Sequence, residues 1–308
     1  MDQIYWYFLD HLSCHPKTIA FDLQKQTRKI LEPFVLNGTV EIFCTCQRIE
    51  IFSTKTLELK ELNDLPFRKI VGYEAIRKRM LKISTGAISQ ILAESNIFDQ
   101  VEGFSKYHCQ NSMLRTLLRE VLLEARFIRK QFQFTSSKGY EDISISLIER
   151  NTLGKNLLII GSGMLARGIY PRLKYTAFKD VFYLTRRNPN SLKKKLGEDG
   201  ENVTVWKVNS IDTNAFNSKP FSVIIATCNI DIEYENQISS ILDFPKCKGI
   251  FDLSSKPLFQ SKILEKKYYS DMYSGDYLEE VRAINTRLLH KQVEINKHID
   301  EISHEFIL

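Results

Sequence analysis

A cysteine close to a fixed positive charge is the group in this sequence best suited to chemistry. The chain of 308 residues contains the run Cys44-Thr45-Cys46-Gln47-Arg48. The thiolate is the nucleophilic form of cysteine, and a nearby cation favours that form. Because Arg48 follows two residues on, we interpret Cys46 as a candidate nucleophile. The alternative is a small buried cysteine within a strand.

The surrounding residues must place this thiol. Apolar and polar residues alternate from Val40 to Phe52, which predicts a strand that breaks near Thr45. We therefore expect, over residues 39–54, either a hairpin-like strand pair or a strand that runs into the site, with Cys46 near the break.

The rest of the first half mixes strand and helix. A strand is predicted over residues 4–9, and helices over 17–33, 73–97 and 111–134, from the spacing of their apolar residues. The last of these helices carries several arginines on its other faces. Such a face is usually solvated, and contact with a nucleic-acid backbone is the alternative.

From residue 151 the pattern changes to strands alternating with helices. Strands are expected over 156–160, 181–184, 203–208, 223–226 and 249–253, and a helix over 164–175. This alternation indicates a doubly wound parallel sheet of the Rossmann type. One last helix of roughly 30 residues, free of Pro and Gly, is predicted from 276 to 306.

A glycine-rich turn stands between the first of these strands and its helix. The run Gly-x-Gly-x-x-Ala is the pattern that brings a backbone close to a dinucleotide pyrophosphate. At the end of the second strand an NAD site would carry a carboxylate, whereas this chain has arginines that suit a 2′-phosphate. NADPH is therefore the expected cofactor. The residues expected to bind it are Gly161, Ser162, Gly163, Met164, Leu165, Ala166, Thr185, Arg186 and Arg187.

The expected fold class is thus α/β in three parts. We predict an α+β catalytic and substrate-recognition domain at 1–140, a Rossmann NADP-binding domain at 150–268, and a long C-terminal helix at 269–308.

Composition adds limits of its own. With 43% hydrophobic residues, 26% charged residues and a net charge of +6, the chain has the composition of a folded globular protein that is compatible with a polyanionic partner. Its six cysteines show no disulfide framework, which favours a reducing cytoplasm. No signal peptide or membrane segment is evident, so a membrane partner is not expected.

Several motifs together resemble the glutamyl-tRNA reductase family. The segment Cys44 to Glu50 is similar to its Ser-Thr-Cys-Asn-Arg-x-Glu signature, and residues 86–89 and 93–101 resemble a second signature. Later landmarks appear in the same order, at Leu153-Gly154-Lys155, Asp252-Leu253 and the run from Tyr273 to Asn285.

The resemblance implies an activity. In that family a cysteine attacks the ester of glutamyl-tRNA, and NADPH reduces the resulting thioester to glutamate-1-semialdehyde, the first step of tetrapyrrole (porphyrin) biosynthesis. It implies that Cys46 is the nucleophile and that Arg79 stands where the family has a histidine. The residues it implies for substrate binding are Thr45, Gln47, Arg48, Ser89, Glu94, Ser95, Asn96 and Gln100. It also leaves open a glutamate-1-semialdehyde aminotransferase as a partner.

Some positions depart from the family pattern and keep alternatives open. Arginine cannot act as a base, so Arg79 would act only through its charge, and His108 is the alternative base. Asn96 stands where the family has Gln, which points to a different amino acid as substrate. Cys44 stands where the family has Ser, which leaves open a redox or metal role for Cys44 and Cys46. The family continues into a dimerisation domain, so we expect a monomer or a helix-mediated dimer. A related enzyme for another aminoacyl-tRNA, and a non-catalytic paralogue that binds tRNA or nucleotide, remain the alternatives.

Overall fold

The protein folds into two compact units. The computed structural model describes residues 4–19, 21–57, 67–152, 155–197, 203–211, 219–227, 232–254 and 268–305. One unit comprises residues 1–137 with 281–308, and the other comprises 138–280. The motif residues Leu153 and Gly154, and the expected helix end at Phe306, lie outside the described residues.

The first unit is built on a four-stranded antiparallel sheet. Its strands are β1 (Tyr5–Asp10), β2 (Val40–Thr45), β3 (Arg48–Ser53) and β4 (Arg68–Val71), in the order β2-β3-β1-β4. The predicted strand pair over 39–54 is confirmed as the β2–β3 hairpin, in which Thr45 pairs with Arg48. Cys46 and Gln47 are therefore the two turn residues.

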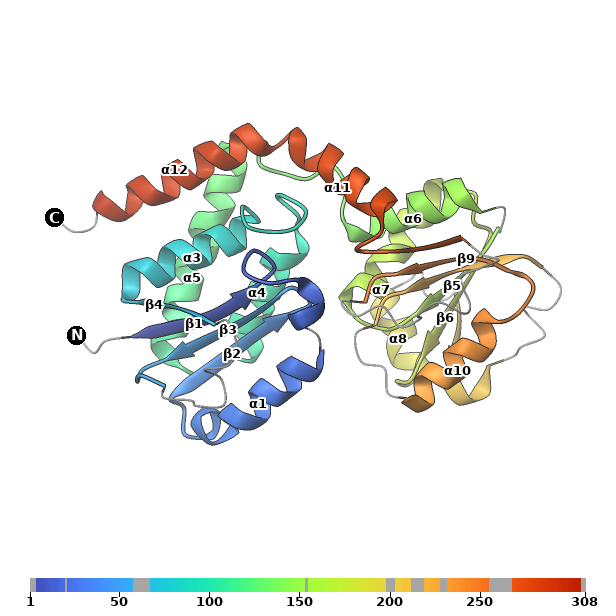
Figure 1. The fold of residues 1–308 in the computed structure, drawn as a ribbon, viewed down its shortest axis with the longest axis horizontal. Coiled ribbons are helices and arrows are strands. Elements are labelled where there is room, and N and C mark those ends of the chain that lie inside the picture. Colours follow the sequence, from blue (N-terminus) through green and yellow to red (C-terminus); the bar gives the residue numbers. More distant parts are fainter. Residues whose placement is uncertain are drawn as a thin grey trace. The chain divides into compact units, whose positions relative to one another are not determined.

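Helices cover both faces of this sheet (Figure 1). The short η1 (Pro16–Ile19) and α1 (Phe21–Leu36) lie on one side, where Leu9, Ile42 and Ile51 form a core. On the other side, Trp6, Phe43 and other apolar residues pack against α3 (Tyr73–Thr85), α4 (Asn96–Tyr107) and α5 (Ser112–Gln131). Successive residues of a strand point to opposite faces, so each strand supplies both cores.

The single helix expected over 73–97 is wrong, because the chain breaks after Thr85. Gly86 caps α3 with φ 79°, a left-handed conformation that favours glycine. A Cβ at this position would lie 3.0 Å from the Cα of Ala93. The next helix starts only at Asn96, which leaves a loop over residues 86–95.

The single C-terminal helix expected over 276–306 is also wrong. Two helices are present, α11 (Gly275–Thr286) and α12 (Leu289–Glu305). Neither Pro nor Gly causes the break. Instead, the backbone N–H of Leu288 turns back to the carbonyl of Asn285 at 2.8 Å, and the Leu288 side chain is buried in the first unit's core. Tertiary packing therefore overrides helix propensity here.

The second unit is a six-stranded parallel sheet with the Rossmann strand order. The strands are β5 (Asn156–Ile160), β6 (Asp180–Thr185), β7 (Thr204–Lys207), β8 (Phe221–Ile225), β9 (Cys247–Asp252) and β10 (Tyr268–Asp271). Their order β10-β9-β8-β5-β6-β7 reverses direction between β5 and β8. In such sheets, ligands bind outside the carboxyl ends of the strands at this reversal. The α/β fold class is confirmed.

Helices flank this second sheet as well. On one face α10 (Ile232–Leu242) packs its apolar residues onto β5, β6 and β8. Toward the other, the Tyr183 hydroxyl of β6 donates to the Ala166 carbonyl of α7 (Met164–Ile169), and α6 (Tyr140–Asn151) packs against β9. The helix expected over 164–175 continues as a 3-10 helix, η2 (Tyr170–Tyr175), and α8 (Pro189–Leu196) and η4 (Val208–Ser210) complete the described helical elements of the unit.

Candidate active site

Strand register gathers charged side chains on one face of the first sheet. Phe8 of β1 pairs with Glu50 of β3, and Asp10 pairs with Arg48. Since alternate residues share a face, Asp10, Arg48 and Glu50 all point toward the side that α3 covers. Arg79 of α3 completes what we call the charge cluster: Asp10, Arg48, Glu50 and Arg79.

Arg79 holds the two carboxylates of this cluster. Its Nη2 lies 2.6 Å from Glu50 Oε1 and 2.8 Å from Asp10 Oδ2, and its Nε donates to Glu50 Oε2 at 2.9 Å. The guanidinium also stacks 3.4 Å from the centre of the Phe8 ring. Burial opposes the ionisation of Asp10, but its hydrogen bond and charge interaction with Arg79 outweigh burial and lower its pKa.

Arg48 is the buried cation of the cluster that retains open donors. Its side chain is only 1% exposed, and its Nη2 donates to the Ile88 carbonyl at 3.0 Å. Among the residues that the structure describes, its Nε and Nη1 have no hydrogen-bond partner. Burial lowers the pKa of Arg48, against the opposing charge of Glu50. Such a guanidinium offers a fork of N–H groups to a carboxylate.

The hairpin turn presents the candidate nucleophile. Cys46 is half-buried, and its neighbour Gln47 is buried. The Thr45 hydroxyl accepts from the Gln47 amide at 3.2 Å, while the Thr45 carbonyl accepts from Gln24 of α1 at 2.7 Å. These bonds fix the turn from both sides, so the thiol stands on a rigid support.

The 86–95 loop joins this turn. Gln47 Nε2 donates to Gln90 Oε1 at 2.6 Å, next to the bond from Arg48 to Ile88. Asn285 of α11 clamps the same loop, because its side chain donates to the Gln90 carbonyl at 2.8 Å and accepts from the Leu92 amide at 2.9 Å. This contact gives a structural role to Asn285, one of the sequence landmarks.

Arg129 of α5 secures the end of the loop. It donates to the carbonyls of Ala93 at 2.8 Å and Glu94 at 2.9 Å. Ala93 has φ 60°, a conformation rarely adopted by residues other than glycine. The loop backbone is thus held by residues from three distant helices, counting Gln292 of α12, whose amide donates to the Ala87 carbonyl at 2.6 Å.

The loop carries three of the predicted substrate residues, and a fourth, Asn96, directly follows it. Ser89 is buried, and its hydroxyl has no hydrogen-bond partner in the described part of the chain. Glu94 is buried too, and its Oε1 accepts from the Ile97 amide at 3.1 Å. Ser95 is exposed as the N-cap residue of α4, which Asn96 begins. Ser89 and Glu94 therefore present polar groups from inside the loop, whereas Ser95 stands at the surface.

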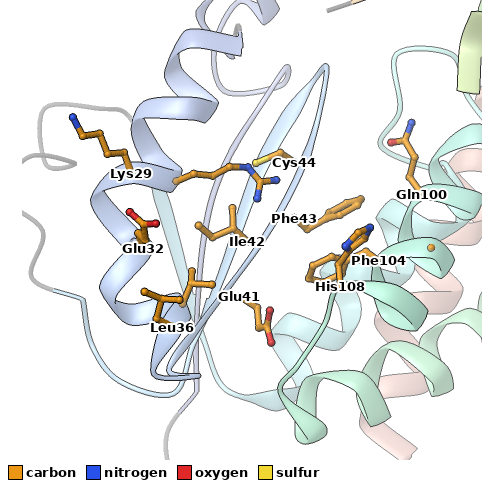
Figure 2. Close-up of a pocket in the computed structure, with 13 residues that line it drawn as sticks. Lys29, Glu32, Leu36, Glu41, Ile42, Phe43, Cys44, Gln100, Phe104 and His108 are labelled. Atoms are coloured by element: carbon orange, nitrogen blue, oxygen red, sulfur yellow. The ribbon is translucent and has the colours of Figure 1, made fainter. Parts of the chain in front are cut away.

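A cavity of about 780 Å³ opens beside β2, the edge strand of the sheet (Figure 2). Gln100 of α4 lines it, together with Cys44, Phe43, Phe104 and His108. The figure shows these side chains between α1 and α4. Cys46, Arg48, Ser89 and Glu94 are not among the residues that line it, so the cavity is separate from the charge cluster.

Cys44 does not share the surroundings of Cys46. It belongs to β2 and packs against the core beneath α1. Burial raises the pKa of the Cys44 thiol to about 11, which makes it a poor nucleophile. Within the described ranges, no group of three or more His, Cys, Asp and Glu residues is arranged to hold a metal ion.

One residue beside the turn was missed at the sequence level. His11 follows β1, and its backbone N–H donates to the Gln47 carbonyl at 3.1 Å. Burial, and next the charge of Arg48, lower the pKa of His11 to about 4, so its imidazole is neutral near pH 7. The available signal was its position two residues after the strand predicted over 4–9.

In the second unit, the glycine loop lies at the point where the strand order reverses. Gly161 is buried with φ 133°, and a Cβ there would lie 2.4 Å from the Ala226 carbonyl oxygen at the end of β8. Gly163 is exposed, and a Cβ there would meet nothing within 4 Å. Gly161 therefore allows β5 and β8 to close together, while Gly163 leaves its backbone open to a ligand.

The other predicted cofactor residues surround this loop. Ser162, Met164 and Leu165 are half-buried, and Ala166 is fully buried where α7 meets β6. These features fit a bound dinucleotide, whose pyrophosphate requires close approach to a glycine backbone.

The residues expected to select the nucleotide follow β6. Thr185 is buried, and its hydroxyl accepts from the Arg187 amide at 3.0 Å, so it shapes the turn. Arg186 and Arg187 are exposed. The Arg186 guanidinium lies 4.7 Å from the centre of the Tyr234 ring, which restrains the side chain.

No helix in the described residues is both long enough and apolar enough to cross a membrane.

The fold and the site define an α/β protein with a Rossmann-type unit and a second unit that presents a thiol beside buried charges. No protein-family model matches the chain. It is 26% identical to protein nfe2 of Rhizobium meliloti over 306 residues, which cover 94% of this chain and 95% of that protein. It is 29% identical to glutamyl-tRNA reductase of Thermosipho melanesiensis over 157 residues, or 48% of this chain and 41% of that protein.

A solved structure also aligns with the chain. The glutamyl-tRNA reductase of Methanopyrus kandleri aligns with 100% of this chain and 81% of its own, at 17% identity and a TM-score of 0.46. The matches to curated glutamyl-tRNA reductases each span less than half of the reductase. These partial matches confirm the resemblance found in the motifs: over about half of its length the chain is similar to glutamyl-tRNA reductases.

Proposed function

We propose that this protein reduces glutamyl-tRNA to glutamate-1-semialdehyde with NADPH, through a thioester on Cys46. The observation that supports this most directly is the buried Arg48. Two of its nitrogens lack partners within the described chain, and it stands two residues from the thiol. An acyl group with a carboxylate at its far end would match both features.

The first step transfers the acyl group. The Cys46 sulfur forms a bond to the ester carbonyl carbon, the bond from that carbon to the tRNA 3′-oxygen breaks, and the thiol proton ends on that oxygen. Arg48 would bind the γ-carboxylate. Glu94 would face the α-ammonium, and the Ser89 hydroxyl adds a buried donor and acceptor beside them.

The remaining predicted residues would hold the hairpin turn in place or line the cavity beside β2. Thr45 and Gln47 hold the turn in place, and Asn96 begins the helix that carries Gln100 into the cavity. Arg79 forms ion pairs with Asp10 and Glu50 and would lend positive charge to the thiol region.

The second unit would hold NADPH, which supplies hydride to the thioester carbon when bound. The Gly161–Ala166 loop would accept the pyrophosphate at the helix start. Arg186 and Arg187, with Thr185 shaping their turn, would pair with the 2′-phosphate. After that reduction, cleavage of the carbon–sulfur bond would free the aldehyde and return Cys46 to a thiol.

The product would enter tetrapyrrole synthesis in the cytoplasm. A semialdehyde of this kind is reactive, so transfer to an aminotransferase fits the chemistry. The proposed reaction is compatible with a monomer and with a dimer. Leu289 and Val293 of α12 are exposed and would supply the apolar contact in a dimer.

A single-turnover assay tests the proposal. Purified protein is mixed with glutamyl-tRNA, with and without NADPH, and both free tRNA and trapped aldehyde are followed. We expect tRNA release in both cases and aldehyde only with NADPH. Release without aldehyde would indicate a thiol-dependent esterase or transferase, and no reaction despite NADPH binding would contradict the proposal.

A further inference from the structure

The proposed acyl transfer moves a proton from the Cys46 thiol to the leaving oxygen, and the protein must provide a group that carries it. Arg79 cannot take a proton, and it is engaged by Asp10 and Glu50. His108 is exposed and lines the cavity beside β2.

His11 lies against the turn that bears the thiol. Its backbone N–H donates to the Gln47 carbonyl at 3.1 Å, and Gln47 directly follows Cys46 in the same two-residue turn. The imidazole Nδ1 is enclosed by protein and has no hydrogen-bond partner among the described residues. A buried nitrogen of this kind is costly unless a ligand or a reacting group uses it.

The charges around His11 determine its state. Arg48 of β3 and Arg79 of α3 disfavour a proton on the ring, and Asp10 of β1 favours one. Burial is the largest influence, and together these effects lower the pKa of His11 to about 4. The ring is therefore neutral at pH 7 and has a lone pair available.

We infer that His11 is the proton carrier for Cys46: it accepts the thiol proton as the sulfur attacks and returns it to the departing oxygen. This inference rests on the proposed function and adds a catalytic residue to it. Because the imidazolium of His11 is more acidic than an ordinary one, it returns the proton readily to the departing oxygen.

The test uses an activated ester, p-nitrophenyl acetate, and needs neither tRNA nor NADPH. Acetylation of Cys46 is followed by peptide mass spectrometry in the intact protein, in His11→Gln and in His108→Gln as matched control. At pH 7 we expect His11→Gln to react more slowly by on the order of 10²-fold, a typical contribution of a general base. His108→Gln should react as the native protein does.

Two further measurements separate a proton carrier from a structural residue. At about pH 10, above the ordinary thiol pKa of about 8.5, the native protein and His11→Gln should react at similar rates, because solvent then ionises the thiol. Added imidazole should restore part of the rate of His11→Ala at pH 7.

Three outcomes would overturn the inference: an unchanged rate in His11→Gln at pH 7, an equal loss at both pH values, or a loss in His108→Gln instead. If His11 controls acetylation but glutamyl-tRNA is not reduced, the inference holds and the proposed function fails.

Discussion

At the scale of single residues, the site depends on charges that are buried together. Asp10, Glu50 and Arg79 satisfy one another, so Arg48 is left with donors for a ligand. An arginine at position 79 suits this arrangement better than a neutral side chain, because two enclosed carboxylates need a cation between them. Burial first, and then the charges of Arg48 and Arg79, lower the pKa of the nearby His11 and keep it neutral near pH 7.

Replacing Arg79 tests this account of the cluster. Arg79→Gln leaves Glu50 and Asp10 buried without their partner, so we expect the free energy of unfolding to fall by about 3–5 kcal/mol in urea denaturation. Lys78→Gln is the matched control. Lys78 lies beside Arg79 on α3 and donates to the Asp300 carbonyl in an exposed contact, so its change should stay within about 0.5 kcal/mol. Equal, small effects would contradict the role of Arg79.

The low pKa of His11 predicts a dependence of stability on pH. Below its ordinary value of 6.5, the imidazole takes up a proton in the unfolded chain but not in the folded one until about pH 4. The free energy of unfolding therefore decreases as the pH falls from 6.5 to about 4, by about 3 kcal/mol at most.

Urea denaturation at several pH values measures this effect. The native protein should lose stability from pH 6.5 to pH 4 more steeply than His11→Gln. Parallel curves for the two proteins would show that His11 titrates normally in the fold.

At the scale of elements, sequence pattern predicted what depends on local periodicity. The alternation around Thr45 predicted the β2–β3 hairpin, and the glycine-rich turn with its flanking strand and helix predicted the Rossmann unit. The pattern could not predict that Asp10 pairs with Arg48, because register depends on strands far apart in the sequence. The charge cluster and the position of His11 follow from that register.

The two helix breaks show the same limit. Apolar spacing continues through Gly86 and through Leu288, so periodicity alone predicts continuous helices. The chain instead bends at both points to form the 86–95 loop and to let Asn285 clamp it. These contacts join segments almost 200 residues apart, with sequence separations of 193 and 195, which no local pattern reveals.

The two glycines of the cofactor loop should respond differently to the same substitution. Gly161→Ala places a Cβ 2.4 Å from a backbone oxygen in a conformation that disfavours alanine, so it should destabilise the second unit and abolish NADPH binding. The Cβ added by Gly163→Ala contacts no protein atom within 4 Å, so the melting temperature should be nearly unchanged. The same Cβ should weaken the binding of NADPH. Thermal unfolding and NADPH fluorescence titration measure both effects, and identical behaviour of the two variants would contradict the assignment.

At the scale of the whole molecule, two units carry two separate sets of residues. The predicted catalytic and substrate residues all fall in residues 1–137, and the predicted cofactor residues all fall in 138–280. The proposed reaction therefore requires that each unit keeps its own binding function, which can be tested one unit at a time within the full chain.

Nucleotide choice is the clearest test of the second unit. Removal of the Arg186 guanidinium should weaken the binding of NADPH by about tenfold or more, since a charge-assisted bond to phosphate is worth about 1.5–3 kcal/mol. The binding of NADH, which has no 2′-phosphate, should hardly change. Binding of both nucleotides to Arg186→Ala is measured by fluorescence. Lys179→Ala is the control, since Lys179 is exposed and precedes β6, at the opposite end of that strand from Arg186. Equal losses for NADPH and NADH would remove the argument for a 2′-phosphate site.

The central claim is that Cys46 carries the glutamyl group, and mass spectrometry tests it most directly. The intact protein, Cys46→Ser and Cys44→Ser are each mixed with glutamyl-tRNA in the absence of NADPH, quenched in acid and digested. The account predicts one glutamyl group on the peptide that contains Cys46, retained in Cys44→Ser and absent from Cys46→Ser. A glutamyl adduct that persists in Cys46→Ser, or none in the native protein, would contradict it.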